Sequence, residues 1–150
     1  MRILIDADAC PVAAVTARLA KKYQIPCVAF CDTSHQLHLP DVQTVTVSKG
    51  ADSVDFALVN QAVAGDVVVT QDYGLAAMCL SRGAHPIRQD GLWYREENID
   101  ALLTARYTAG EIRRSGGRTK GPKKRGSKED LIFAESMEKL LQSLILAKNN

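Results

Sequence analysis

Near its start the sequence reads Arg2-Ile3-Leu4-Ile5-Asp6-Ala7-Asp8, a short apolar run that ends in two aspartates. An apolar run of this length indicates a buried strand. A second run, Val67-Val68-Val69-Thr70-Gln71-Asp72, has the same form. The carboxyl ends of parallel strands share one edge of a sheet, and ligands bind there at the point where the strand order reverses. We therefore expect Asp6, Asp8 and Asp72 to lie near one another.

The rest of the chain alternates between strand and helix patterns. Further strands are predicted at 26–31, 44–47 and 84–88, with a small added strand at 91–94, and helices at 11–23, 52–63, 73–81, 96–114 and from 127 onward. The order β-α-β-β-α-β-α-β-α-α predicts an α/β fold, a three-layer α/β/α sandwich with a mainly parallel central sheet of about five strands. We interpret residues 1–150 as one domain that ends in a helix.

Each aspartate also has an ordinary structural role available to it. Pro11 suits the first turn of a helix, which Asp8 or its neighbour would cap. Asp52 and Asp72 likewise stand just before helical segments. The last helix starts with Ser127-Lys-Glu-Asp130, which is similar to a capping box.

Taken together, the aspartates favour a functional site. Gly50-Ala-Asp-Ser-Val-Asp55 opens the central helix and adds two carboxylates to those at the strand ends. Crowded like charges raise some of their pKa values and cost stability unless a cation neutralises them. Hard oxygen ligands suit Mg²⁺ or Mn²⁺. We predict a catalytic set of Asp6, Asp8, Asp55 and Asp72, and a metal-ligand set of these four with Asp52.

The charge of the chain is unevenly distributed. The net charge is +2, but eight of the 19 Lys and Arg residues lie in residues 113–128, a segment without acids. The remainder carries 11 basic against 17 acidic residues, a net charge of −6. A basic, glycine-rich segment cannot bury a core and is expected to be mobile and to bind a polyanion, here RNA. Its nucleic-acid-binding candidates are Arg113, Arg114, Arg118, Lys120, Lys123, Lys124, Arg125 and Lys128.

Other features limit the choice of function. The four cysteines form no C-x-x-C pair and are interpreted as buried free thiols; together with His35 and His38 they match no standard zinc spacing. No apolar run approaches a membrane span, and a carboxylate follows too soon for a signal peptide, so we expect a cytoplasmic protein. The sequence leaves open whether it forms a homo-oligomer.

Several motifs resemble the YaiI/YqxD family of bacterial proteins over nearly the whole chain. They are Ile5-Asp-Ala-Asp-Ala-Cys-Pro11, Gly50-Ala-Asp-Ser-Val-Asp55, Gly65-Asp-Val-Val-Val-Thr-Gln-Asp-Tyr-Gly-Leu-Ala76, Ser81-Arg-Gly-Ala84 and the later Thr119-Lys-Gly-Pro122. That family in turn resembles PIN-like domains, metal-dependent nucleases with an α/β/α sandwich and an acidic site. The resemblance implies that Asp6 and Asp72 are the strand-end acids and that Asp52 or Asp55 is the acid of the central helix, where PIN sites often have Glu. Asp8 is an additional family carboxylate.

Three functions remain open at this point. The first is a nuclease in which the aspartates hold one or two metal ions and Tyr73 either stacks on a base or packs on the body. The second is an aspartyl-phosphate phosphatase of haloacid-dehalogenase type, with Asp6 as nucleophile and Asp8 as acid. That reading requires Gly65-Asp66 after a strand, whereas Asp66 precedes one and is expected at the opposite sheet edge. The third is a non-catalytic RNA- or ribosome-binding protein.

Overall fold

The computed structural model describes residues 1–34, 37–50, 52–116 and 124–149. Its elements are β1 (Ile3–Asp6), α1 (Ala13–Lys22), β2 (Cys27–Asp32), β3 (Gln43–Val47), α2 (Ser53–Gln61), β4 (Val67–Val69), α3 (Tyr73–Ser81), β5 (His85–Ile87), α4 (Glu96–Arg114) and α5 (Ser127–Lys148). The predicted order of strands and helices is confirmed.

The five strands form one sheet in the order β3-β2-β1-β4-β5, and every pair of neighbouring strands is parallel. The chain builds outward from β1 to β2 and β3 and then returns to the other side for β4 and β5. The strand order therefore reverses between β1 and β4, at the centre of the sheet. Ligands of open parallel sheets bind at such a point.

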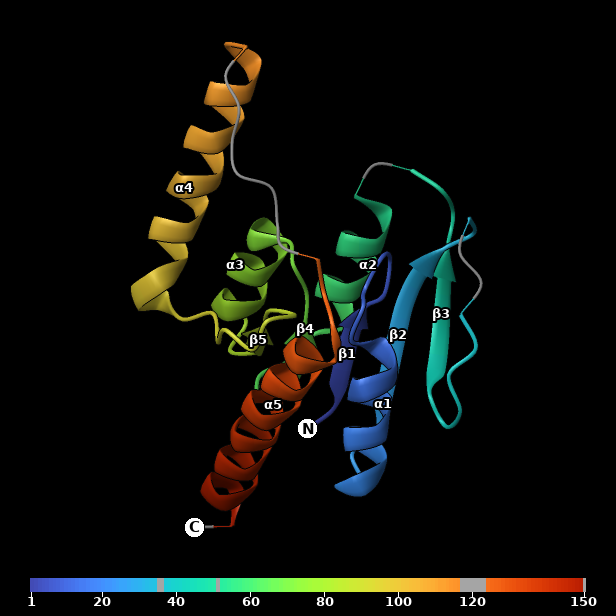
Figure 1. Cartoon of the computed structure of the whole chain (residues 1–150). Helices are drawn as coiled ribbons and strands as arrows, with labels where there is room; N and C mark the ends of the chain where they lie inside the picture. The colour runs from blue at the N-terminus through green and yellow to red at the C-terminus, as the bar shows by residue number, and fades with distance from the viewer. Residues whose placement is uncertain (35–36, 51, 117–123, 150) are drawn as a thin grey trace.

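Helices cover both faces of the sheet, which gives the predicted three layers (Figure 1). Because successive side chains of a strand point to opposite faces, Ile3 and Ile5 pack in the cluster formed with α1 and α5. Leu4 packs in the opposite cluster, formed with α2 and α3. Helix α4 packs on the outer side of α3 through the buried residue Ile99.

Three local predictions were wrong. Residues 91–94 form no strand, and only an isolated antiparallel bridge joins Trp93 to Ile87. Helix α1 begins at Ala13, with no side-chain cap, because Pro11 lies in a turn that precedes it. The expected capping box at Ser127 is absent: the N-cap of α5 is Gly126, which has no side chain, and only the return bond is made, from the backbone N–H of Gly126 to Glu129 at 2.9 Å.

Asp66 lies at the opposite edge of the sheet from the strand ends, as predicted. It is buried, and it accepts hydrogen bonds from the backbone N–H of Arg2 at 3.0 Å and of Val63 at 3.1 Å. Its carboxylate also forms an ion pair with Arg2 at 3.1 Å. These contacts join β1 to the turn before β4 and give Asp66 a structural role.

Candidate acidic site

The centre of the candidate site is a hydrogen-bond chain through Thr70. Because Ile5 pairs with Val69, the next residues on β1 and after β4, Asp6 and Thr70, lie side by side. The hydroxyl of Thr70 donates to Asp6 Oδ2 at 2.8 Å and accepts from the backbone N–H of Asp72 at 3.0 Å. Thr70 is itself buried. One side chain therefore fixes the positions of both strand-end acids.

Asp72 has the structural role that sequence favoured and also faces the site. It is the N-cap of α3, and its Oδ1 accepts a hydrogen bond from the backbone N–H of Leu75 at 3.1 Å. Its carboxyl group also repels that of Asp55, in the first turn of α2. Capping therefore occupies only part of the hydrogen-bonding capacity of Asp72.

The acids interact strongly enough to change their protonation. Burial, followed by repulsion from Asp72 and Asp8, raises the pKa of Asp6 from 3.8 to about 6, although the Thr70 hydrogen bond opposes this change. Burial, followed by the charges of Asp72 and Asp6, raises the pKa of Asp55 to about 7. Groups with such displaced pKa values are typical of functional sites, although structural clusters also produce them.

Asp8 and Asp52 lie at the margins of this group. Asp8 does not cap α1; its Oδ1 accepts a hydrogen bond from the backbone N–H of Asp32 at 3.3 Å. Asp52 is exposed, has a φ of 61°, and makes no side-chain cap hydrogen bond to α2, so its predicted cap role is wrong. Both still contribute charge, Asp8 toward Asp6 and Asp52 toward Asp55.

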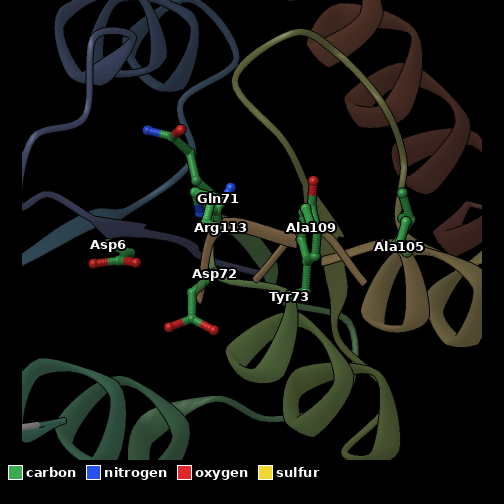
Figure 2. A pocket seen from close by; sticks show the side chains of 8 residues that line it. Asp6, Gln71, Asp72, Tyr73, Ala105, Ala109 and Arg113 are labelled. Carbon is green, nitrogen blue, oxygen red and sulfur yellow. The ribbon is translucent and has the colours of Figure 1, made fainter. Parts of the chain in front are cut away.

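A pocket of about 620 Å³ opens beside Asp6 and Asp72 (Figure 2). Its opposite wall is α4, which contributes the apolar residues Leu102, Ala105 and Ala109 and, near the end of the helix, Arg113. This volume is within the range of ligand-binding pockets. A cationic side chain from the predicted basic segment thus lines the same pocket as two of the predicted metal ligands.

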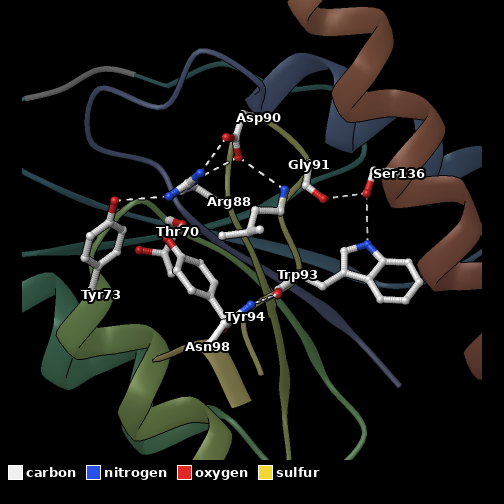
Figure 3. Close-up of polar contacts among 10 residues, drawn as sticks. Thr70, Tyr73, Arg88, Asp90, Gly91, Trp93, Tyr94, Asn98 and Ser136 are labelled. Atoms are coloured by element: carbon white, nitrogen blue, oxygen red, sulfur yellow. Dashed lines mark hydrogen bonds and ion pairs between the residues drawn. The ribbon is translucent and has the colours of Figure 1, made fainter. Parts of the chain in front are cut away.

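Tyr73 also lines the pocket and is held by neighbours that the sequence did not identify (Figure 3). Arg88 donates to its hydroxyl at 3.1 Å, and Arg88 is held in turn by two hydrogen bonds to Asp90, at 2.8 and 2.6 Å. The ring of Tyr94 meets the Tyr73 ring edge-on at 5.9 Å. Arg88 follows β5, so the strand-end rule, applied to residues other than carboxylates, would have found it.

Only part of the basic segment belongs to the described residues. Arg113 and Arg114 end α4, where Arg114 pairs with Glu111, and Arg125 forms an ion pair with Asp130 at 2.8 Å. Lys124 and Lys128 are exposed. Arg118, Lys120 and Lys123, and the predicted mobility of the segment, lie outside the described residues.

Cys10 is close to the acids but is not a candidate nucleophile. Burial, with a contribution from the charge of Asp6, raises the pKa of its thiol to about 11. All four cysteines are free thiols, as predicted, and three of them are buried. Because the thiolate is the reactive form, Cys10 stays protonated and inert at neutral pH.

The described part of the chain contains no group of three or more His, Cys, Asp or Glu side chains arranged to hold a metal ion. A zinc site of several protein ligands is therefore absent there. Mg²⁺ needs fewer protein ligands, because it is usually held by one or two carboxylates, with water and substrate phosphate completing its shell. The carboxylates of Asp6, Asp55 and Asp72 are hard oxygen donors, and one or two of them would suffice for such an ion.

Within the described residues, no helix is both long and apolar enough to cross a membrane.

Comparison with known proteins identifies relatives that match most of the chain. The model of the YaiI/YqxD family, described as uncharacterised, matches residues 4–143. A UPF0178 protein of Exiguobacterium sibiricum is 52% identical over 141 residues, covering 94% of this chain and 96% of that protein. A UPF0178 protein of Ruminiclostridium cellulolyticum is 48% identical over 137 residues, covering 91% of this chain and 90% of that protein. No solved structure gives a significant match.

Proposed function

The chain belongs to the YaiI/YqxD family, and from the chemistry of its acidic site we propose that it is a Mg²⁺- or Mn²⁺-dependent nuclease that hydrolyses single-stranded RNA. One observation carries the proposal: Asp6, Asp55 and Asp72 come from three separate segments and interact where the strand order reverses. Burying and crowding carboxylates costs stability. A site that binds a divalent cation compensates for that cost.

The proposed ligands are one or two of the carboxylates of Asp6, Asp55 and Asp72, with water and substrate phosphate completing the shell, and with Asp8 and Asp52 in supporting positions. A bound metal ion would activate water and stabilise the leaving oxygen of a phosphodiester. Thr70 holds Asp6 and the backbone of Asp72 in place, which fixes the geometry of the ligands before the ion binds. Asp72 keeps one oxygen on the α3 cap, so its side chain is held firmly as well.

The choice of a nucleic acid depends on the cations that adjoin the acids. Arg113 lines the acidic pocket, and Arg114 follows it at the end of α4. Lys124 is exposed and lies just before the start of α5. A polyanion would be held by these side chains together with the predicted cations Arg118, Lys120 and Lys123, which lie outside the described residues, while the net negative remainder of the chain repels it elsewhere. The preference for a single RNA strand comes from the PIN resemblance.

The test is metal-dependent cleavage of a short fluorescent single-stranded RNA. We expect cleavage with Mg²⁺ or Mn²⁺, none with a chelator, and a loss of at least about a hundredfold in Asp6→Asn and Asp72→Asn. Asp100→Asn is the matched control, because Asp100 is an exposed aspartate on α4 outside the acidic pocket. Equal cleavage by Asp6→Asn and the parent protein would contradict the proposal.

The rival functions give different results in the same assay. A phosphatase of haloacid-dehalogenase type would hydrolyse phosphomonoesters and leave the strand intact. The position of Asp66 counts against this function, because its carboxylate is engaged with Arg2 at the edge away from the strand ends. A non-catalytic RNA-binding protein would bind the strand without cleaving it and would retain its affinity in Asp6→Asn.

A further inference from the structure

A second pocket, of about 480 Å³, adjoins the acidic pocket. It is lined by Gln71, Tyr73, Arg88, Gln89, Asp90, Arg125 and Glu129. Gln71 and Tyr73 line both pockets, so the two meet at the Tyr73 side chain. A nucleotide strand whose phosphate reached Asp6 and Asp72 could therefore place an adjoining group in the second pocket.

The lining of this second pocket suits a neutral polar ligand better than a phosphate. Its two arginines are balanced by Asp90 and Glu129, and Arg88 is already held by Asp90 through two hydrogen bonds. The other lining groups are two amides and an aromatic ring. Amide and guanidinium groups around an aromatic surface are the contacts that proteins use to recognise unstacked bases.

Tyr73 offers an aromatic surface whose orientation is fixed in advance. Its hydroxyl accepts the hydrogen bond from Arg88, and its ring packs edge-on against Tyr94 (Figure 3). The Tyr94 hydroxyl in turn donates to the carbonyl of Thr70 at 3.2 Å, which connects the ring pair to the acidic site. A ring held in this way loses little freedom when a base stacks on it.

Two polar atoms of the lining residues are buried without a hydrogen-bond partner among the described residues, a donor on Arg125 and an acceptor on Gln89. The donor is Nη2 of Arg125, whose Nε is bound to Asp130 at 2.8 Å, and the acceptor is Oε1 of Gln89. Unmatched buried groups of this kind cost free energy that a complementary ligand recovers. The edge of a nucleobase supplies both an acceptor and a donor, whereas an ionised phosphodiester supplies acceptors alone. Both atoms lie beneath the surface of the pocket, so a ligand must draw their side chains outward as it binds.

We infer that the pocket between Tyr73 and Arg125 is a nucleobase subsite, in which one base of the strand stacks on Tyr73 and bonds through its edge to Gln89 and Arg125. This inference depends on the proposed function for the identity of the strand. In this arrangement the base beside the scissile phosphate contributes to affinity, so binding does not depend on charge alone.

The experiment compares two strands of equal charge under a chelator, which prevents cleavage. One is hexauridylate and the other is the same ribose-phosphate chain without bases, and affinity is measured by competition against a fluorescent RNA. The parent protein should bind the base-bearing strand about tenfold more tightly, the scale of one stacked base. Tyr73→Ala and Gln89→Leu should remove most of this preference, whereas Tyr73→Phe, which keeps the ring, should retain it. Lys139→Gln removes an exposed charge on α5 from a residue that does not line the pocket, and it should change nothing.

Hydrolysis of bis(p-nitrophenyl) phosphate with Mg²⁺ or Mn²⁺ tests the acidic site separately, because that ester carries no base. If the ester is hydrolysed but both strands bind equally, the base subsite is overturned and the catalytic proposal stands. If the preference for bases persists in both Tyr73→Ala and Gln89→Leu, the subsite is also overturned. Base-dependent binding without any hydrolysis would support the subsite and reject the catalytic proposal, and failure of both strands to bind would reject the subsite together with the choice of RNA.

Discussion

Asp6→Asn is expected to stabilise the protein at neutral pH, although it removes the central residue of the candidate site. The substitution keeps one side-chain oxygen to accept the hydrogen bond from Thr70, removes the charge, and replaces the other oxygen by an amide group. Raising the Asp6 pKa from 3.8 to about 6 corresponds to about 3 kcal/mol of destabilisation by the ionised form. Because Asp6 keeps some solvent contact and shares its repulsion with Asp72 and Asp8, we expect a gain of about 2 kcal/mol, or several degrees in Tm.

The pH dependence of this gain in stability tests whether the gain comes from removing the charge of Asp6. The folded-state pKa of Asp6 lies above its unfolded value, so the folded state binds more protons between about pH 4 and pH 6. Stability from the protonated group is present below pH 4 and is lost as pH rises through 6. Parent and Asp6→Asn should therefore have similar free energies of unfolding near pH 4 and diverge up to pH 7.5, as measured by urea titration at each pH.

Adding Mg²⁺ or Mn²⁺ should reverse the order of stability. An ion that binds only the folded parent raises its Tm by mass action, whereas Asp6→Asn should respond weakly because a ligand is missing. If the gain in stability of Asp6→Asn without metal does not depend on pH, or if the variant is less stable than the parent at pH 7.5, the electrostatic reasoning is refuted. An equal metal response in parent and variant would refute the ligand role alone.

Three further outcomes are expected. Thr70→Val removes the hydrogen bond that lowers the pKa of Asp6, so the pH midpoint of the metal-induced Tm increase should move upward, and Thr70→Ser should restore it. Asp66→Asn should destabilise the fold by about 2 kcal/mol in urea titrations and leave the metal response unchanged, because it weakens a buried ion pair away from the site. RNA binding through about four phosphates should give a log–log salt slope near −3, which neutralising Lys123 and Lys124 should flatten in a filter-binding titration for all sequences alike.

The fold could be predicted because the hydrophobic pattern of the sequence agrees with the topology of the sheet. The run Val67–Val69 is buried on both faces, as its composition indicates, and it lies beside β1 in the sheet centre. Asp6 and Asp72 then follow at the same sheet edge from strand direction alone. What local pattern could not determine was where each helix begins, because Pro11 suits a turn as well as a first helical residue.

The sequence alone could not identify residues whose contacts depend on how neighbouring strands are aligned. Thr70 contacts Asp6 only because Ile5 pairs with Val69, and strand registers across the sheet are not visible in a single sequence. Arg88 lies at the same sheet edge, directly after β5, but an arginine was not among the residue types expected in a metal site. The hydroxyl and the guanidinium determine how the acids and Tyr73 are held, so the candidate site is more than its charged ligands.

Asp72 shows why weighing each aspartate separately misleads. As a single residue it favours a helix cap, and the structure confirms that cap. Yet the same carboxyl is a main source of the repulsion that raises the pKa values of Asp6 and Asp55. The cap holds the Asp72 carboxyl in place through a backbone N–H near the start of α3. A carboxyl group fixed by a helix cap cannot turn away from its neighbours, so the structural role of Asp72 maintains the crowding of acids on which the proposed metal site depends.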